Sequence, residues 1–322
     1  MEYSFISISI FFILLSFMRR RKDGDSFFLG SKDGGILSIS LSISATWIGS
    51  TTLFVLSIWV YRYGSAATWY LIAPGIGLIL LGIFGVDEIR KKKGDSLAEY
   101  FTSKGVSQIV RISIFIIYTL FIAAQLVGFA KLSTVFNFSY TFGLFIGASV
   151  VGIYVLIGGF NSVRDTDVIQ LLLVITAMFV LFIGLSTDEL DLATFSPIFS
   201  PLDFLPSSTF IFYLTLGSLM FIAQDNHQRI KASKNSFTAK CSCINAGVLI
   251  IIYALSIAAL VSTLPPSSGN PIIENLSRLG PASLIIVSTG ILAAALSSAD
   301  SALNISSYSL SSLKKNWINE KS

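Results

Sequence analysis

The stretch SSADSALNISS, residues 297–307, is the part of the chain that best indicates its fold class. It follows directly on an apolar run from Ile285 to Leu296 that has the composition of a membrane helix. In this stretch five serines surround one acidic residue, Asp300. A charged side chain at the centre of a bilayer costs at least about 2.5 kcal/mol on insertion scales, so it should face protein, water or an ion. The stretch therefore predicts a membrane helix with a functional polar face.

The composition of the whole chain also indicates a membrane protein. Of 322 residues, 53% are apolar and 12% are charged, whereas a soluble domain carries about 25% charged residues. The net charge of +4 comes from basic residues that cluster between apolar runs, which is a pattern of membrane topology and not of nucleic-acid binding. Cys241 and Cys243 are too close together to indicate a disulfide framework. The lone histidine, His227, excludes a histidine-rich metal site within this chain.

Nine apolar segments are predicted to be helices. They are 3–18, 36–58, 64–84, 108–133, 140–157, 166–186, 208–224, 241–263 and 281–309. Each is about long enough to cross a bilayer core of about 30 Å, which takes roughly 20 residues. The first is short, but its positive charges at 19–22 follow the apolar run, whereas a signal peptide carries them before it. We therefore expect one transmembrane domain, residues 1–322, with the termini on opposite sides.

The basic residues predict the orientation of the chain. With the amino terminus outside, all but three of the 22 lysines and arginines fall in inner loops; Arg62, Lys131 and Arg278 remain outside. Cytoplasmic loops carry such an excess of basic residues. The sequence therefore predicts a multi-pass protein of the plasma membrane, with an outer amino terminus and a cytoplasmic carboxyl terminus.

Hydroxyl side chains interrupt the apolar segment 36–58. They are Ser38, Ser40, Ser42, Ser44, Thr46, Ser50, Thr51 and Thr52. Small hydroxyls let helices pack closely and can bond back to their own helix, which would explain any one of them. The whole set makes the segment a candidate for local unwinding, because broken helices in transporters expose carbonyls that bind ions near the membrane midplane.

A second polar stripe is predicted on the last helix. Helical spacing places Ala294, Ser297, Ser298 and Ser301 on one face, and Asp300 lies close to it. Hydroxyl oxygens and unwound carbonyls suit a small hard cation, and soft-metal ligands are missing here. The alternative for Asp300 is a position near the inner interface, about one turn beyond the apolar run.

Two acidic residues follow a predicted inner turn at Gly158-Gly159. Asp165 is placed where a helix begins, and the helix dipole stabilises a carboxylate there. Asp167 lies further into the same helix and is the better candidate for a functional carboxylate.

Six segments, in order, resemble the sodium/solute symporter family, whose members carry sugars, proline, pantothenate, sialic acid and monocarboxylates. They are DSFFLG (25–30), SATWIGS (44–50) with VYRYG (60–64), SLAEYFTSK (96–104), GGFNSVRDTDVIQ (158–170), QDNHQRIKASK (224–234) and AALSSADSALNISS (294–307). One such segment would be weak evidence. Six in the family's order are specific, and they run across nearly the whole chain.

The resemblance implies an all-α membrane protein with an inverted-repeat, leucine-transporter-like bundle and one extra amino-terminal helix. The first and sixth core helices would be broken, the sixth at Gly217-Ser218. The implied sodium site consists of Ala45, Ile48, Ala294, Ser297 and Ser298. Asp167 falls on the position that the family links to cation coupling, and Asp300, nearly one turn inward, is expected to attract or receive the cation.

The implied function is sodium-coupled symport of a small organic solute by alternating access, with Na+ as the coupling ion. The nine predicted spans match only the extra helix and core helices one to eight, so the second repeat is expected to be incomplete. The alternative is a transport-inactive truncated relative that acts as a membrane sensor, a partner subunit or a remnant. An oligomer or a partner subunit would then supply the missing helices.

An enzyme is not expected. A serine nucleophile needs a base beside it, and His227 is predicted in an inner loop. No phosphate-binding glycine loop is present either, which argues against ATP-driven transport.

The solute is not predicted, and sugars, amino acids, carboxylates and vitamins stay open. Trp47, Thr51 and Phe54, on the first core helix, are candidate walls of a substrate pocket. Gln125 either faces that pocket or makes an interhelical hydrogen bond, and neither interpretation is favoured.

Overall fold

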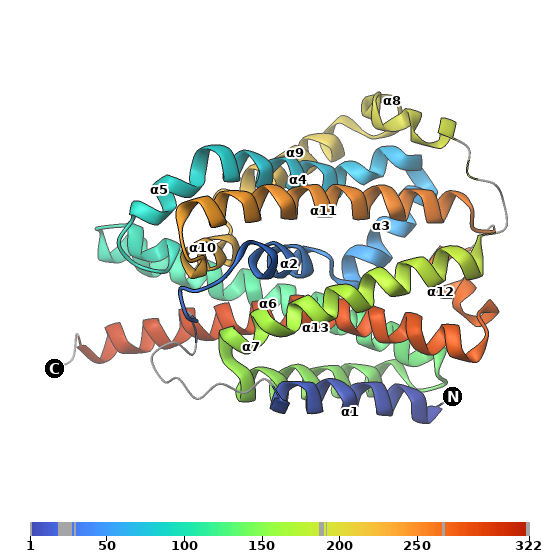
Figure 1. Cartoon of the computed structure of the whole chain (residues 1–322), viewed down its shortest axis with the longest axis horizontal. Coiled ribbons are helices and arrows are strands. Elements are labelled where there is room, and N and C mark those ends of the chain that lie inside the picture. Colours follow the sequence, from blue (N-terminus) through green and yellow to red (C-terminus); the bar gives the residue numbers. More distant parts are fainter. Residues whose placement is uncertain are drawn as a thin grey trace.

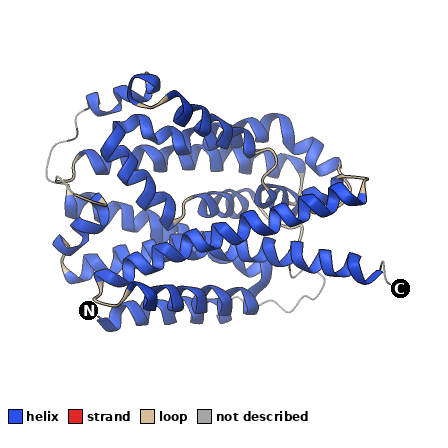
Figure 2. Ribbon diagram, turned by 180° about the vertical axis from the view of Figure 1, so that it is seen from behind, coloured by secondary structure: helices blue, strands red, loops and turns tan. Residues whose placement is uncertain are grey.

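The computed structural model describes residues 2–18, 28, 30–186, 190, 192–265 and 268–319 of the chain. Regular structure in these ranges is helical throughout, without a strand (Figure 2). The elements are α1 (Glu2–Met18), α2 (Ile36–Trp47), α3 (Ser50–Tyr63), η1 (Gly64–Thr68), α4 (Trp69–Leu80), η2 (Leu81–Gly85), α5 (Val86–Lys91), η3 (Leu97–Tyr100), α6 (Lys104–Val135), α7 (Tyr140–Leu185), η4 (Leu192–Ile198), α8 (Pro201–Phe204), α9 (Ser207–Leu219), α10 (Gln224–Ala232), α11 (Ser236–Ser262), α12 (Pro271–Asn275), η5 (Leu276–Arg278) and α13 (Pro281–Asn319). Most of the long helices run along one axis of an elongated bundle (Figure 1).

The apolar helices are those of a multi-pass membrane protein. Six helical runs within the described residues are long and apolar enough to cross a membrane. They are Ser50–Lys91, Lys104–Val135, Val163–Leu185, Ser207–Ala232, Ser236–Ser262 and Pro281–Leu313. Shorter apolar helices lie at Ser4–Leu14, Ile36–Trp47 and Tyr140–Leu156. Together these helices contain most of every predicted segment, although residues 50–58 and 64–84 share one helical run.

That shared run turns at Gly64, where α3 gives way to η1. Gly64 has a φ of 65°, a left-handed conformation that glycine adopts without a steric penalty. The predicted boundary between the second and third apolar segments therefore corresponds to this turn.

The first core helix is broken, as the sequence predicted. α2 ends at Trp47, α3 begins at Ser50, and Ile48 and Gly49 lie between them. Ile48 has a ψ of 60°, and Gly49 is extended, with φ −87° and ψ 166°. The last carbonyls of a helix accept no hydrogen bond from their own helix. A break in the helix therefore leaves these carbonyls free to bind other donors or ions.

The second break lies later than predicted. We expected it at Gly217-Ser218, but α9 continues through both residues to Leu219. The helix is interrupted at 220–223, and α10 begins at Gln224. Gly217 instead permits close packing, because a Cβ there would lie 2.6 Å from the carbonyl oxygen of Ala73 on α4.

The fifth and sixth predicted helices are one continuous helix, α7. The predicted turn at Gly158-Gly159 lies inside its assigned range, Tyr140–Leu185. The ribbon nevertheless changes direction sharply, so that the first part of α7 lies beside α1 and the second part crosses the bundle (Figure 1). The prediction of two helices separated by a turn at Gly158-Gly159 was therefore wrong.

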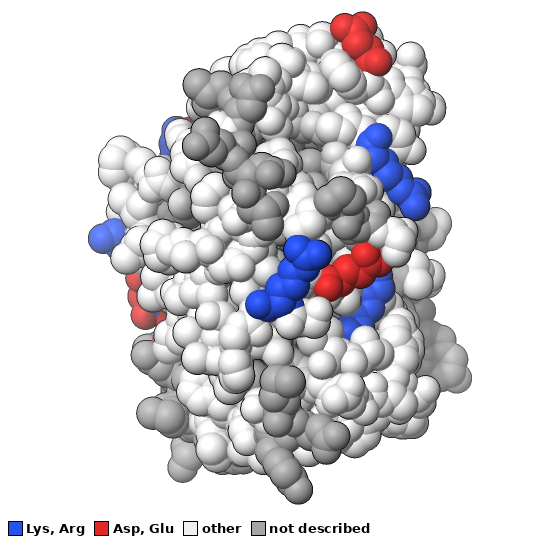
Figure 3. All heavy atoms as spheres, turned by 90° about the vertical axis from the view of Figure 1, so that its right-hand side faces the viewer, with Lys and Arg blue, Asp and Glu red and all other residues white. Residues whose placement is uncertain are grey.

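The two ends of the bundle differ in charge. The end that carries η4, α8 and α12 shows only a few charged side chains (Figure 3). At the opposite end, Arg90 donates to the carbonyls of Ile230 and Ser233, at 2.7 and 2.9 Å. There Arg164 also pairs with Asp33 at 2.9 Å, and the Ser31 hydroxyl and the Arg164 guanidinium lower the pKa of Asp33.

This asymmetry agrees with the predicted orientation, which stays a prediction. Several residues behind that prediction, the basic stretch 19–22 among them, lie outside the described residues, as does most of the DSFFLG segment.

Candidate functional site

The broken helix α2 is joined to α13 by serine hydroxyls. Ser297 Oγ donates to the carbonyl oxygen of Ala45 at 2.9 Å. Ser298 Oγ donates to the carbonyl oxygen of Thr46 at 2.8 Å and lies 3.4 Å from that of Ala45. These residues are all buried. The structure thus brings together two segments separated by about 250 residues, at the point where α2 ends.

Of the five residues predicted to bind sodium, four lie in direct contact. The carbonyl oxygen of Ala294 accepts a second hydrogen bond from Ser297 Oγ, at 3.1 Å. Ile48 lies within the break and is buried. Its neighbour Gly49 is pressed against α13, since a Cβ there would lie 2.7 Å from Ser298 Oγ. The five residues therefore surround one buried region, and their role in binding sodium stays a prediction.

The available atoms in this region are carbonyl and hydroxyl oxygens. Such oxygens suit small hard cations, whereas softer metals prefer sulfur and imidazole. Among the described residues, no group of three or more His, Cys, Asp or Glu side chains could hold a metal ion. The donor set therefore fits a monovalent or other hard cation.

Next to this region, Asp167 on α7 forms a buried ion pair with Arg229 on α10. The carboxylate Oδ2 lies 3.4 Å from Arg229 Nη2 and accepts a 2.5 Å hydrogen bond from Ser42 Oγ. Both charged side chains have 0% exposure. Asp165, the predicted helix-start carboxylate, instead pairs with Arg164 at 3.4 Å.

The Arg229 guanidinium reaches three other helices. It donates to Ser42 Oγ at 2.8 Å and Thr46 Oγ1 at 2.6 Å on α2, and to Ser301 Oγ at 2.7 Å on α13. Thr46 connects this cluster to the α2 break, because its carbonyl accepts from Ser298. The ion pair and the predicted sodium site are thus parts of one polar network.

Arg229 and His227 are residues whose places the sequence analysis missed. Both were assigned to an inner loop, but both lie on α10, with 0% and 2% exposure. The His227 ring also bonds the carbonyl of Phe221, with Nε2 at 2.7 Å. A signal for this placement existed: the half-helix that follows a break is expected to enter the centre of the bundle.

Asp300 is buried within protein. Its exposure is 0%, and α13 continues beyond it to Asn319. Its depth relative to the inner membrane interface stays a prediction. Neither carboxylate oxygen of Asp300 has a hydrogen-bond partner among the described residues, and the same holds for the side-chain amide of Asn304, one turn on.

Of the residues predicted to line a substrate pocket, Thr51 and Gln125 join α3 to α6. Thr51 Oγ1 donates to the carbonyl of Ala124 at 2.7 Å, and Gln125 Oε1 accepts from Ser50 Oγ at 3.2 Å. Gln125 thus makes an interhelical hydrogen bond, one of its two open interpretations. Phe54 is buried in the core.

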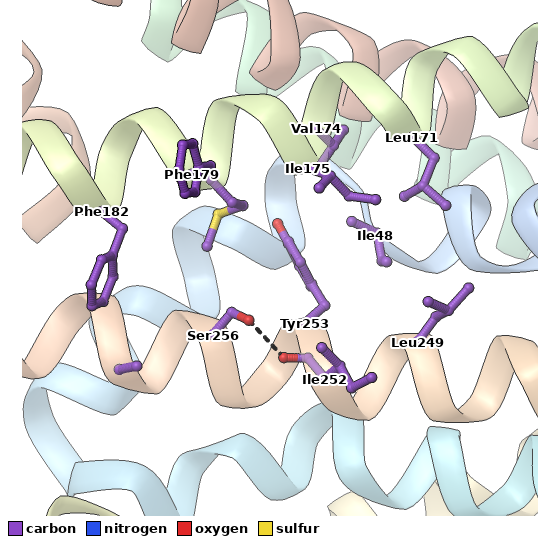
Figure 4. Close-up of a pocket in the computed structure, with 12 residues that line it drawn as sticks. Ile48, Leu171, Val174, Ile175, Phe179, Phe182, Leu249, Ile252, Tyr253 and Ser256 are labelled. Carbon is purple, nitrogen blue, oxygen red and sulfur yellow. Dashed lines mark hydrogen bonds between the residues drawn. The ribbon is translucent and has the colours of Figure 1, made fainter.

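Two cavities flank the α2 break. One, of about 390 Å³, is an apolar groove between the second part of α7 and α11. Ile48 and Tyr253 both extend into it (Figure 4). The other, of about 580 Å³, lies between α2, α6 and the α9–α10 break, and Trp47 is part of its wall.

A family model described as the sodium:solute symporter family matches residues 27–196, more than half of the chain. The chain is 26% identical over 277 residues to the sodium/proline symporter of Escherichia coli (strain K12), covering 76% of this chain and 55% of that protein. It is 27% identical over 323 residues to the sodium/proline symporter of Haemophilus influenzae, covering 88% of this chain and 64% of that protein. The sodium/pantothenate symporter of Escherichia coli is 27% identical over 192 residues, covering 55% of this chain and 39% of that protein. The chain therefore spans less than two thirds of the length of these relatives.

A solved structure shows the same fold. It is a Na+-coupled sialic acid symporter in a substrate-bound, outward-open state, with a TM-score of 0.77 and 19% identity. The match covers 97% of this chain and 73% of that one. It confirms the predicted fold class, an all-α inverted-repeat membrane bundle.

Proposed function

Because the chain belongs to the sodium:solute symporter family, we propose that it moves a small organic solute in symport with sodium, by alternating access. The observation that carries this proposal is the convergence of α2 carbonyls and α13 hydroxyls at the helix break. The family consists of transporters and not of enzymes. The plasma membrane is the proposed location.

The proposed sodium ligands are the oxygens of Ala45, Ile48, Ala294, Ser297 and Ser298. The two hydroxyls now donate to α2 carbonyls. On sodium binding they would rotate to present lone pairs, and the carbonyls they release would become ligands too. An ion loses its hydration shell only where several oxygens are already in place, and the break provides them in one buried region.

This arrangement would couple ion binding to conformation. A sodium ion bound by oxygens of both α2 and α13 would replace the direct hydrogen bonds between the two helices. The position of the α2 break would then depend on whether the ion is bound. Asp167 and Asp300 would supply negative charge nearby, with Asp300 receiving the cation on its way inward.

For the solute, Trp47 is the proposed pocket residue best supported by position, because it lines the larger cavity. Thr51 and Gln125 are not among the described residues that line this cavity, and their role in binding the solute stays a proposal. Their bonds to Ala124 and Ser50 show that they also hold α3 against α6.

The test is sodium-dependent stabilisation of the purified chain. We expect sodium, but not choline at equal ionic strength, to raise the temperature of thermal unfolding. The Ser297→Ala/Ser298→Ala double variant should lose this response, because both hydroxyl ligands are gone. Ser306→Ala is the matched control, since Ser306 is a buried α13 hydroxyl whose hydrogen bond among the described residues is to Leu303 of its own helix. An equal sodium response in the wild type and the double variant would refute the proposed site.

A further inference from the structure

Among the described residues, the buried charged side chains are three aspartates and three arginines, and the aspartates lie near only one of the arginines, Arg229. Asp167, Asp225 and Asp300 have exposures of 0%, 2% and 0%, and Arg229 lies among them. Arg229 pairs with Asp167, and its only bond to Asp225 is to the backbone carbonyl, at 3.4 Å. An unpaired buried charge is costly, so a buried carboxylate without a basic partner, such as Asp225, is a candidate counter-ion for a cation.

Asp225 is held in a defined orientation at the start of α10. Its Oδ1 accepts a 2.5 Å hydrogen bond from the Tyr118 hydroxyl, and the backbone amide of Asp225 donates to the Tyr118 hydroxyl oxygen at 3.0 Å. The amino-terminal end of a helix favours an ionised carboxylate. The second oxygen, Oδ2, is buried and has no hydrogen-bond partner among the described residues.

The cavity of about 580 Å³ contains this carboxylate in its wall. Asp225 is the one charged side chain among the described residues that line it. The rest of the wall is mainly apolar, and it includes three aromatic residues, Trp47, Tyr118 and Phe121. Arg111, another buried guanidinium on α6, is not part of the wall and pairs with Glu99 at 3.4 Å.

This wall suits an organic cation better than a metal ion. A bare cation such as sodium needs several oxygens to replace its water, and the cavity offers mostly carbon. An alkylammonium group can donate to Oδ2 while aromatic rings contact its charge, and its hydrocarbon part can contact the apolar wall. Trp47 Nε1 is also buried without a partner among the described residues and can donate to an acceptor on the same ligand.

We propose that this cavity binds the cationic amino group of the transported solute, with Asp225 as its counter-ion and Tyr118 as the residue that orients Asp225. The proposal rests on the proposed function and narrows it to amine-bearing solutes.

The test uses three probes with the same ring and different charge: cyclohexylamine, cyclohexanol and cyclohexanecarboxylate. Binding to the full chain in lipid nanodiscs is measured by calorimetry at neutral pH, with empty nanodiscs as blanks. We expect the amine to bind roughly tenfold more tightly than the alcohol, and the carboxylate to bind most weakly. Equal affinities for amine and alcohol would overturn the proposal, and this comparison needs no variant.

Asp225→Asn preserves the shape of the side chain and removes its charge. The affinity for cyclohexylamine should fall to that for cyclohexanol. Asp203→Asn, on the exposed helix α8, is the control and should change neither affinity. A preference for the amine that survives in Asp225→Asn would overturn the role of this carboxylate.

Sodium-dependent stabilisation, measured on the same samples, separates this proposal from the proposed function. A sodium response without amine preference refutes only the amine site. Amine preference without a sodium response supports the amine site and refutes sodium coupling.

Discussion

Arg229 connects four helices through buried hydrogen bonds. From α10 it binds oxygen atoms on α2, α7 and α13. A buried ion pair is not in itself evidence of high stability, because both charges lose their hydration. Removing the charge of one partner is nevertheless costly, because the other charge then stays buried without a counter-ion.

We therefore predict that Arg229→Gln lowers the free energy of unfolding by about 3–5 kcal/mol. Asp167→Asn should be destabilising for the same reason. The double variant should lose less than the sum of the two, because neither charge is then left unpaired. Denaturant titration of the purified variants measures all three. Arg62→Gln, on the exposed end of α3, is the control; strictly additive losses at Arg229 and Asp167 would contradict the coupling.

The sequence was informative about Ser297, Ser298 and Asp167, and less so about Arg229. The serines stand at helical spacing within an apolar helix, where a polar side chain already suggests a function. Arg229 lies in a polar segment, QDNHQRIKASK, which has the composition of a surface loop. Its burial depends on where α10 packs, and composition alone carries no information about that.

At the scale of helices, the α2–α3 break depends on a close approach between three elements. A Cβ on Gly49 would lie 2.7 Å from Ser298 Oγ on α13 and 2.8 Å from Gln125 Oε1 on α6. Gly49 is extended, a conformation that any residue can adopt, so the requirement for glycine comes from space and not from backbone strain.

We predict that Gly49→Ala moves the break away from α13 and weakens the sodium response of the chain. Gly35→Ala is a closely matched control. Gly35 is also the residue before a helix, with φ −81° and ψ 169°, but a Cβ there meets nothing within 4 Å. Sodium-dependent thermal unfolding of both variants measures the effect. A sodium response in Gly49→Ala equal to that of Gly35→Ala would show that the contact is unimportant.

Helix breaks were predicted with uneven success, and the reason is local. The hydroxyl-rich segment 36–58 signals its break through many polar side chains. The second break has no such signal, and the small residues Gly217-Ser218, where it was predicted, lie within α9. Of these two, Gly217 packs against Ala73 on α4, whereas Ser218 is exposed and bonds within its own helix. The break itself lies at 220–223, directly before the buried helix α10.

At the scale of the whole molecule, apolar segments, broken helices and family resemblance all predicted the same fold class. Hydrophobic length and composition are strong signals in a membrane protein, because every backbone polar group in the bilayer must be satisfied within helices or barrels. What the sequence could not give was the pairing of distant segments, such as Ser42 with Asp167 or Tyr118 with Asp225.

The orientation in the membrane is the remaining property at this scale. Basic side chains such as Arg90 and Arg164 gather at the end that carries α5, η3 and α10, whereas few charged side chains of described residues are seen at the end with α8 and α12 (Figure 3). Cytoplasmic ends of membrane proteins carry the excess of Lys and Arg. The asymmetry therefore supports the prediction that the α10 end faces the cytoplasm.

A pair of single cysteines tests this prediction. Ser103 and Ser208 are exposed serines at helix starts, on the α5–η3 end and the α8 end respectively. Each is changed to cysteine in a chain where Cys241 and Cys243 are replaced by serine. In sealed right-side-out vesicles, a membrane-impermeant thiol reagent should label Ser208→Cys and not Ser103→Cys. Permeabilised vesicles should label both, which controls for access. Labelling of Ser103→Cys alone before permeabilisation would reverse the orientation, and with it the direction in which Asp300 would pass the cation.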